Sequence, residues 1–256
     1  MTSLPRRSFL GGIVAAVAAA CSSGSKRASS SGAGGPSSNA PSSSDRPTTA
    51  TQPTTTFVST GRRDRPQVAL TYHVSGDRTS VTRLLDVLDE RSVKITAFMV
   101  GSWLEANADL AARFLSAGHE IANHTYTHLT FPKLSRAEMQ QEVVRCRDTL
   151  QHVAGTTGRF FRPSGTSNGT DDPSAVVHEV ARAAGYDTLA GFDVDPADYA
   201  DPGARAVVDR TLGAVHPGAI VSLHFGHAGT IDAMPGILDG LRARGLQPVT
   251  LSELLA

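Results

Sequence analysis

The sequence predicts an α/β protein, a parallel sheet or barrel of strands covered by helices, and three observations support this class. Short apolar runs alternate with amphipathic stretches from Pro66 to the C-terminus. Such alternation is typical of parallel strands joined by crossover helices. About 200 residues follow a low-complexity N-terminal region, which is enough for one domain with a substantial core.

The strands and helices are expected in turn along this domain. Apolar runs bounded by turn residues predict strands at 67–71, 94–99, 119–123, 159–161, 188–192, 219–223 and 247–250. Amphipathic spacing predicts helices at 81–89, 104–117, 135–153, 173–184, 204–215 and 231–244. Ser135 and Glu138 have the spacing of a capping box, which indicates that the third helix begins there.

The charge balance argues against nucleic acid as a partner. Lys and Arg together number 24, as do Asp and Glu, so the formal net charge is zero. No basic stripe with interleaved aromatic residues is present. We expect a monomeric protein that does not bind nucleic acid.

Residues 1–21 have the features of an export signal. Arg6 and Arg7 precede an apolar run, Leu10 to Ala20, that is too short to span a bilayer. The arginine pair resembles the twin-arginine signal used for folded cargo. Small residues before Cys21 and a polar tract after it resemble a lipoprotein processing site, so lipidation of Cys21 and a membrane anchor are expected. The alternative is ordinary cleavage after an A-x-A sequence. With either kind of processing, the protein is expected to leave the cytoplasm for the cell envelope.

Residues 22–62 are expected to be a disordered linker, and residues 63–256 the folded domain. The linker is rich in Ser, Thr, Pro, Gly and Ala and cannot bury enough apolar surface to fold. As a flexible tether it would have an r.m.s. end-to-end distance of roughly 30–40 Å. The other cysteine, Cys146, falls in a helical pattern and is expected to be a small buried hydrophobe, so no disulfide framework is expected.

A histidine pair, His124 and His128, follows the third predicted strand. If residues 124–128 form a helical turn, the two imidazoles share one face and can bind one cation. Four other loops after predicted strands also carry His, Asp or Arg: 72–77, 162–165, 193–198 and 224–227. The carboxyl ends of parallel strands meet at one rim, so these side chains are expected to form one site. Either member of the pair taken alone could be a surface histidine.

Five ordered segments make the chain resemble the polysaccharide deacetylases, the NodB-like carbohydrate esterase family 4. They are 97–101, 118–128, 161–165, 195–199 and 222–224, and the likeness extends from Pro66 to Ala256. The resemblance implies an irregular seven-stranded (β/α) barrel. It also implies a divalent metal ion, most often zinc, held by one Asp and two His.

The resemblance carries residue roles with it. His124 and His128 match the histidine ligands, and His224 matches the acid that protonates the departing amine. Arg162 matches the arginine that orients the base, and Asp198 the aspartate that tunes the acid. Leu223 matches the apolar wall for the acetyl methyl group, and Tyr72 and Gly165 are further expected substrate contacts.

The first motif departs from the family pattern Thr-Phe-Asp-Asp-Gly, which supplies the base and then the third ligand. Here the segment is Thr71-Tyr72-His73-Val74-Ser75-Gly76-Asp77, so His73 stands at the position of the base. Neither Val74 nor Ser75 is a suitable zinc ligand.

Three interpretations of this motif remain open. Asp77 completes the metal site with His73 as base; or His73 is the third ligand with Asp77 as base; or the site is degenerate and binds glycan without cleaving it. Arg162 favours a nearby carboxylate, because a guanidinium beside an imidazole depresses its pKa. Asp195 or Asp198 could also supply that carboxylate.

The function expected from the sequence is metal-dependent removal of acetyl groups from an N-acetylated sugar polymer of the cell envelope, such as peptidoglycan or a chitin-like glycan. The alternatives are a non-catalytic glycan-binding lipoprotein and an esterase acting on O-acetyl groups.

Overall fold

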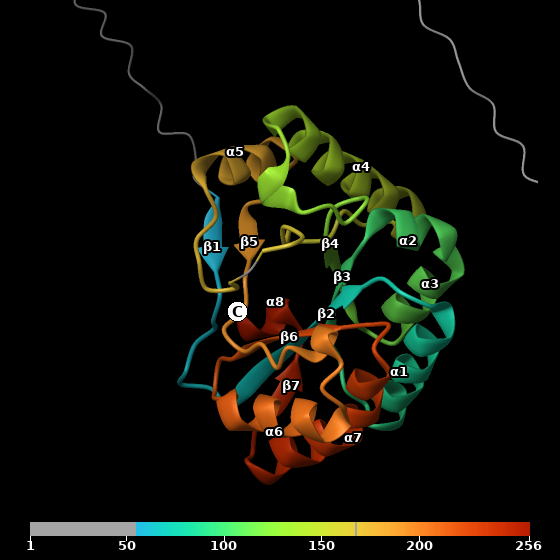
Figure 1. The fold of residues 1–256 in the computed structure, drawn as a ribbon, viewed down its shortest axis with the longest axis vertical. Helices are drawn as coiled ribbons and strands as arrows, with labels where there is room; N and C mark the ends of the chain where they lie inside the picture. The colour runs from blue at the N-terminus through green and yellow to red at the C-terminus, as the bar shows by residue number, and fades with distance from the viewer. Residues whose placement is uncertain (1–54, 167) are drawn as a thin grey trace, which may run out of the picture. The chain divides into compact units, whose positions relative to one another are not determined.

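The computed structural model describes residues 55–166 and 168–256 (Figure 1). Its strands are β1 (Thr56–Val58), β2 (Gln67–Val74), β3 (Thr96–Met99), β4 (Glu120–Asn123), β5 (Thr188–Ala190), β6 (Ile220–His224) and β7 (Gln247–Val249). Its α-helices are α1 (Arg78–Glu90), α2 (Gly101–Ala106), α3 (Ala108–Ser116), α4 (Arg136–Ala154), α5 (Ala175–Ala183), α6 (Ala204–Ala214), α7 (Ala228–Ala243) and α8 (Leu251–Leu254). The export signal, Cys21 and most of the predicted linker lie outside the described residues.

The strands form two parallel sheets. The larger has the order β4-β3-β2-β6, with β7 also paired to β2, and the smaller pairs β1 with β5. Single bridges connect them, from Asn123 to Phe161, from Phe161 to Leu189 and from Val194 to Val221. The predicted strand at 159–161 is therefore reduced to bridges at Phe161. The α/β class is confirmed, whereas a continuous seven-stranded barrel is not formed by the described residues.

Alternation along β2 and β6 separates an inner core from an outer one. Ala69 and Ile220 belong to a small cluster with Phe98, Phe160 and Phe192. Their neighbours on the opposite faces belong to a larger cluster with the apolar sides of α1 and α7, which lie against the sheet (Figure 1). Polar residues on the inner face near the carboxyl ends of the strands therefore converge, as they do in other parallel α/β folds.

Most of the predicted helices are confirmed, and α4 begins with the predicted capping box between Ser135 and Glu138. The predicted helix at 104–117 is interrupted at Asn107, which separates α2 from α3. The folded region also begins earlier than predicted, because β1 lies inside residues assigned to the linker. No helix in the described part of the chain has both the length and the apolar character that crossing a membrane requires.

Candidate metal and acid–base site

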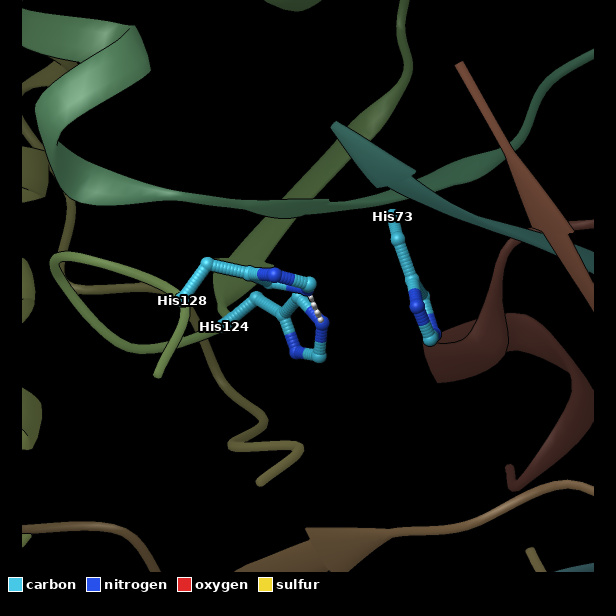
Figure 2. Close-up of side chains that lie close together, drawn as sticks. All are labelled: His73, His124 and His128. Carbon is cyan, nitrogen blue, oxygen red and sulfur yellow. Dashed lines mark hydrogen bonds between the residues drawn. The ribbon is translucent and has the colours of Figure 1, made fainter. Parts of the chain in front are cut away.

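His124 and His128 meet, but not as a helical turn. The segment after β4 is an irregular loop in which Thr125 and His128 have positive φ angles of 68° and 61°. The prediction of a helical turn is therefore wrong, since this left-handed backbone brings the rings together by another route. The two Nε2 atoms lie 3.2 Å apart. Figure 2 shows the two rings side by side, with His73 pointing into the same space from the end of β2.

The loop is held from the side of α2 by main-chain hydrogen bonds. The amides of Gly101 and Ser102 donate to the carbonyls of Thr125 (3.0 Å) and Tyr126 (2.9 Å). The first amides of a helix lack partners within the helix, so they are free to make these bonds. Gly101 is required here, because a Cβ atom at this position would lie 2.6 Å from the Tyr126 ring.

The three histidines form a group consistent with a metal site. One ligand atom from each of His73, His124 and His128 lies within 4.8 Å of the others. Burial lowers the pKa of His73 and of His124 well below the usual value, and neighbouring histidines and Arg162 lower it further. Burial also lowers the pKa of His128. All three imidazoles are therefore neutral near pH 7, which is the form that binds metal.

The geometry of the pair fits a divalent metal ion. Two imidazole nitrogens at zinc–nitrogen distances of about 2.0–2.1 Å in a tetrahedral site are separated by about 3.3–3.4 Å. The observed 3.2 Å is close to this value, and in this structure it is the length of a hydrogen bond in which His128 Nε2 donates to His124 Nε2, so binding of a metal by both nitrogens requires the other tautomer of His128. In addition, His124 Nδ1 lies 2.8 Å from the carbonyl oxygen of Arg162, a hydrogen bond of the kind that orients metal-binding histidines.

His73 is in direct contact with Arg162. The Arg162 Nη1 atom lies 3.1 Å from His73 Nε2, and the Ser222 hydroxyl lies 3.4 Å from the same nitrogen. A guanidinium has only donors, so His73 Nε2 must accept and Nδ1 must carry the proton. In this tautomer neither nitrogen has a free lone pair. Binding of a metal through Nδ1 requires the opposite tautomer, in which Nε2–H is directed to Ser222.

Arg162 has no carboxylate partner among the described residues. It is fully buried, and its other hydrogen bonds go to Thr71 Oγ1 and to the carbonyls of Ala190 and Gly191. Burial lowers the pKa of Arg162 to about 9, so it is still charged at neutral pH. The Phe98 ring lies 4.0 Å from the guanidinium carbon and provides a cation–π contact.

The carboxylates expected near Arg162 are engaged elsewhere. Asp195 accepts from the amide of Ala197 at 2.7 Å. Asp198 is buried beside His224, where it accepts from the His224 amide at 2.8 Å and pairs with His224 Nδ1 at 2.8 Å. Thr230 of α7 donates a further hydrogen bond to Asp198 at 2.7 Å. The predicted pairing of His224 with Asp198 is thus present in the structure.

Asp77 does not reach the histidines. It is the N-cap of α1, where its carboxylate accepts from the amide of Ser80 at 3.0 Å and from the Ser80 hydroxyl. A side chain that caps a helix three residues later points along that helix, so it serves neither as the third ligand nor as the base. The roles given to Asp77 in both interpretations are therefore wrong for this structure, whereas the second interpretation's placement of His73 beside His124 and His128 agrees with the grouping of the three histidines. Val74, at the end of β2, is fully buried in the outer core.

Two predicted substrate contacts face away from the site. Tyr72 is fully buried, and its hydroxyl donates to the sulfur of Met234. Leu223 belongs to the same outer core, because it alternates with Ser222 and His224 along β6. Neither residue can contact a substrate in this arrangement. Gly165 is exposed and has a φ of +65°; a Cβ atom there would lie 2.9 Å from Thr130 Cα, and its contact with substrate stays a prediction.

Sequence reasoning gave no role to three residues that the structure brings to the site. Ser222 contacts His73, Glu142 contacts the loop of the histidine pair, and the Tyr199 ring lies 5.3 Å from that of His224. Tyr199 is 52% exposed, so its ring is accessible beside the histidines. Its position directly after Asp198 was the available signal. No local pattern pointed to Glu142, which lies within α4.

The chain is similar in sequence to known proteins. The family model described as polysaccharide deacetylase matches residues 60–189. A peptidoglycan-N-acetylglucosamine deacetylase from Bacillus cereus is 31% identical over 192 residues, which cover 73% of this chain and 87% of that protein. A chitooligosaccharide deacetylase from Sinorhizobium fredii is 31% identical over 163 residues, 63% of this chain and 73% of that protein.

A solved structure is also similar. It is a pseudoenzyme of carbohydrate esterase family 4 from Bacillus anthracis, with a TM-score of 0.72 and 26% identity over 79% of this chain and 69% of that one. A mutant of that pseudoenzyme is described as having restored enzymatic activity.

Proposed function

The chain belongs to the polysaccharide deacetylase family, and we propose that it is a metal-dependent deacetylase of N-acetylated glycan polymers at the cell envelope. The observation that carries this proposal is the convergence of His124 and His128 beside the His224–Asp198 pair, since the ring of His73 lies 4.2 Å from that of His124 and 4.4 Å from that of His224. A metal site and a proton donor next to each other are the two components that amide hydrolysis requires.

In this proposal each component has a defined role. His124 and His128 would hold a divalent ion, whose chemistry when bound is Lewis-acid polarisation of a carbonyl and acidification of water. Asp198 holds His224 by Nδ1, which leaves Nε2 to deliver a proton to the departing amine nitrogen. The exposed Tyr199 ring offers an apolar face for a sugar beside that proton donor.

The substrate class and location follow from the relatives and from the N-terminal sequence. The relatives are named for peptidoglycan and chitooligosaccharide substrates, so an acetylated glucosamine polymer is the substrate class proposed. We further propose export through the twin-arginine signal and anchoring through Cys21, with the protein acting as a monomer on the outer face of the membrane.

A second function, glycan binding without cleavage, is favoured by one observation. The Arg162–His73 contact leaves no free base at the position where the family has an aspartate. A family member of similar structure is a pseudoenzyme. Hydrolysis of O-acetyl esters is a third outcome, because an ester carbonyl is more electrophilic than an amide carbonyl and its leaving group depends less on protonation by an acid.

The test combines metal binding with acetate release. The chain without residues 1–21 is loaded with zinc, cobalt or nickel and incubated with chitooligosaccharides and with peptidoglycan. We expect acetate release that His128→Ala abolishes together with metal binding, and that His224→Ala abolishes while metal stays bound.

The variant His73→Asp separates the candidate functions. It gives Arg162 a carboxylate partner and restores an acceptor at the position of the base. If the wild type binds glycan and releases no acetate but His73→Asp does, the protein is a glycan-binding member. Release from O-acetylated substrates alone identifies an esterase. A wild type that binds neither metal nor glycan contradicts all three functions.

A further inference from the structure

We infer that Glu142, on α4, is a positioning residue that sets the spacing of the His124 and His128 nitrogens. This inference rests on the metal site of the proposed function. Glu142 lies in the middle of a 19-residue helix, away from every segment that resembles the family motifs, and it is 9% exposed. Its carboxylate nevertheless ends at the loop that carries the two candidate ligands.

One carboxylate makes three hydrogen bonds to two of the three residues that lie between the histidines. Glu142 Oε2 accepts from the amides of Tyr126 (3.0 Å) and Thr127 (2.8 Å). Oε1 accepts from the Thr127 hydroxyl at 2.7 Å. Tyr126 and Thr127 lie between the two histidines in the sequence, so their backbone influences the distance between the two imidazoles.

The loop needs such external support because its backbone is unfavourable. Thr125 is β-branched and His128 is not glycine, yet both have positive φ angles. Conformations of this kind are unfavourable for residues that carry a side chain and persist only when surrounding contacts hold them. The helix α2 binds the carbonyls of the loop, as described above, but the amides of Tyr126 and Thr127 face the opposite side. Glu142 is the group that satisfies them.

The helix α4 thus fixes the loop from one side and α2 from the other. With both sets of contacts in place, the two Nε2 atoms are 3.2 Å apart. Without the carboxylate, the central amides have no acceptor, and the loop is free to separate the rings. A preorganised pair binds a metal more tightly, because the ion does not have to order the loop.

Two conservative variants separate the position of this group from its charge. Glu142→Gln keeps an acceptor oxygen at the same distance along the side chain and removes the charge. Glu142→Asp keeps the charge and withdraws the carboxylate by one methylene group. The matched control is Gln141→Asn, which shortens an exposed neighbouring side chain by the same amount on the same helix.

The measurement is the dissociation constant for zinc and for cobalt, by competition with a chelating dye, on protein below its melting temperature. We expect Glu142→Asp to weaken binding at least about tenfold, the range typical of residues that orient ligands. Glu142→Gln is expected within about threefold of the wild type, and Gln141→Asn is expected to be unchanged. The increase in melting temperature on adding zinc is expected to follow the same order.

The outcomes that overturn the inference are distinct from failure of the proposed function. If the wild type binds neither metal, the proposed function fails, and the inference fails with it. If the wild type binds metal and Glu142→Asp binds it equally well, only the inference is wrong. If Glu142→Gln is weakened as much as Glu142→Asp, Glu142 acts through its charge, and the positioning role is excluded.

Discussion

At the scale of single residues, His224 depends on Asp198 for its orientation and for the place of its proton. The carboxylate accepts from both the amide and the Nδ1 atom of His224, and Thr230 holds the carboxylate in turn. An asparagine at position 198 keeps the size of this group but loses the charge that stabilises a protonated imidazole. The contact is buried, so solvent cannot replace it.

We therefore expect Asp198→Asn to reduce acetate release about 100-fold or more, the usual contribution of a general acid. The reason is that His224 is no longer held with Nε2 as its acidic atom. The measurement is the steady-state rate of the metal-loaded protein, with metal affinity as the control. Unchanged turnover, or a loss of metal in parallel with activity, would contradict this role.

His119 makes stability dependent on pH at a place distant from the candidate site. Its Nδ1 accepts from the amide of Ile95 at 3.3 Å, while its Nε2 is buried without a partner. Burial lowers the pKa of His119 below 6.5, and Arg113 and Lys94 add to that effect while Asp89 opposes it. The unfolded chain therefore takes up this proton at a higher pH than the folded chain does.

The contribution of neutral His119 to the free energy of unfolding is therefore fully present above about pH 6.5. It decreases as the pH falls toward the pKa of His119 in the folded state. The variant His119→Gln keeps a hydrogen-bonding side chain that does not titrate. Urea unfolding at pH 7.5 and at pH 5 should show a smaller loss in the variant than in the wild type. The other buried histidines are present in both the wild type and the variant. The difference between the two losses of stability therefore reports on His119. Equal losses would exclude this explanation.

At the scale of elements, α4 connects the folding of a helix with the geometry of the histidine loop. Its first turn is closed by the capping box, in which the Ser135 hydroxyl accepts from the Glu138 amide and the Glu138 carboxylate accepts from the Ser135 amide. Its last turn ends at Gly155 with a φ of 68°, a conformation suited to glycine. These two local signals define where α4 begins and ends, and so they place Glu142 within the helix.

We expect Ser135→Ala to reduce the free energy of unfolding by about 1 kcal/mol, the typical cost of losing an N-cap side chain. Thermal or urea denaturation gives this value. The change lies two turns from Glu142, so metal affinity should stay close to that of the wild type. A variant as stable as the wild type would mean that the Glu138 half of the box is sufficient.

Strand alternation explains why two predicted substrate contacts were wrong. The strand β2 continues through Val74, so its side chains keep alternating to the end. His73 therefore points inward, while Tyr72 and Val74 point to the helices. In β6, Ser222 and His224 point inward and Leu223 does not.

At the scale of the whole molecule, β1 closes the smaller sheet and is absent from the predicted domain. It pairs with β5 from Thr56↔Thr188 to Val58↔Ala190, and the Val58 carbonyl accepts from the Gly191 amide at 2.7 Å. Gly191 also accepts from Arg162 at 2.7 Å, so β1 is two hydrogen bonds away from the candidate site. Phe57 packs against the apolar cluster of α4 and α5.

A chain that begins at residue 63 should accordingly melt lower than one that begins at residue 51. We expect the melting temperature to decrease by at least about 4 °C. In a chain of this size, losing 1 kcal/mol of the free energy of unfolding lowers the melting temperature by about 2–4 °C. Differential scanning calorimetry of the two chains measures it. Equal melting temperatures would show that β1 does not contribute to the stability of the fold.

The sequence alone determined the features that depend on neighbours along the chain. The apolar periods located most strands and helices, and the Ser135–Glu138 spacing located the start of α4. The order of the polar loops brought His124, His128, Arg162, Asp198 and His224 to one rim. These predictions succeed because each depends on spacings of a few residues, or on the rule that parallel strands end at the same edge.

Only the tertiary structure decided the features that depend on distant partners. Asp77 caps a helix instead of binding metal, because the amide of Ser80 is nearer to it than the histidines are. Arg162 contacts His73, which is 89 positions earlier in the sequence. The strand β1 pairs with β5, which is about 130 positions later. The spacing of His124 and His128, which lie on a loop, depends on the Glu142 carboxylate of α4. A hydrogen bond between such distant segments leaves no periodic trace in the sequence, because it is set by how the elements pack.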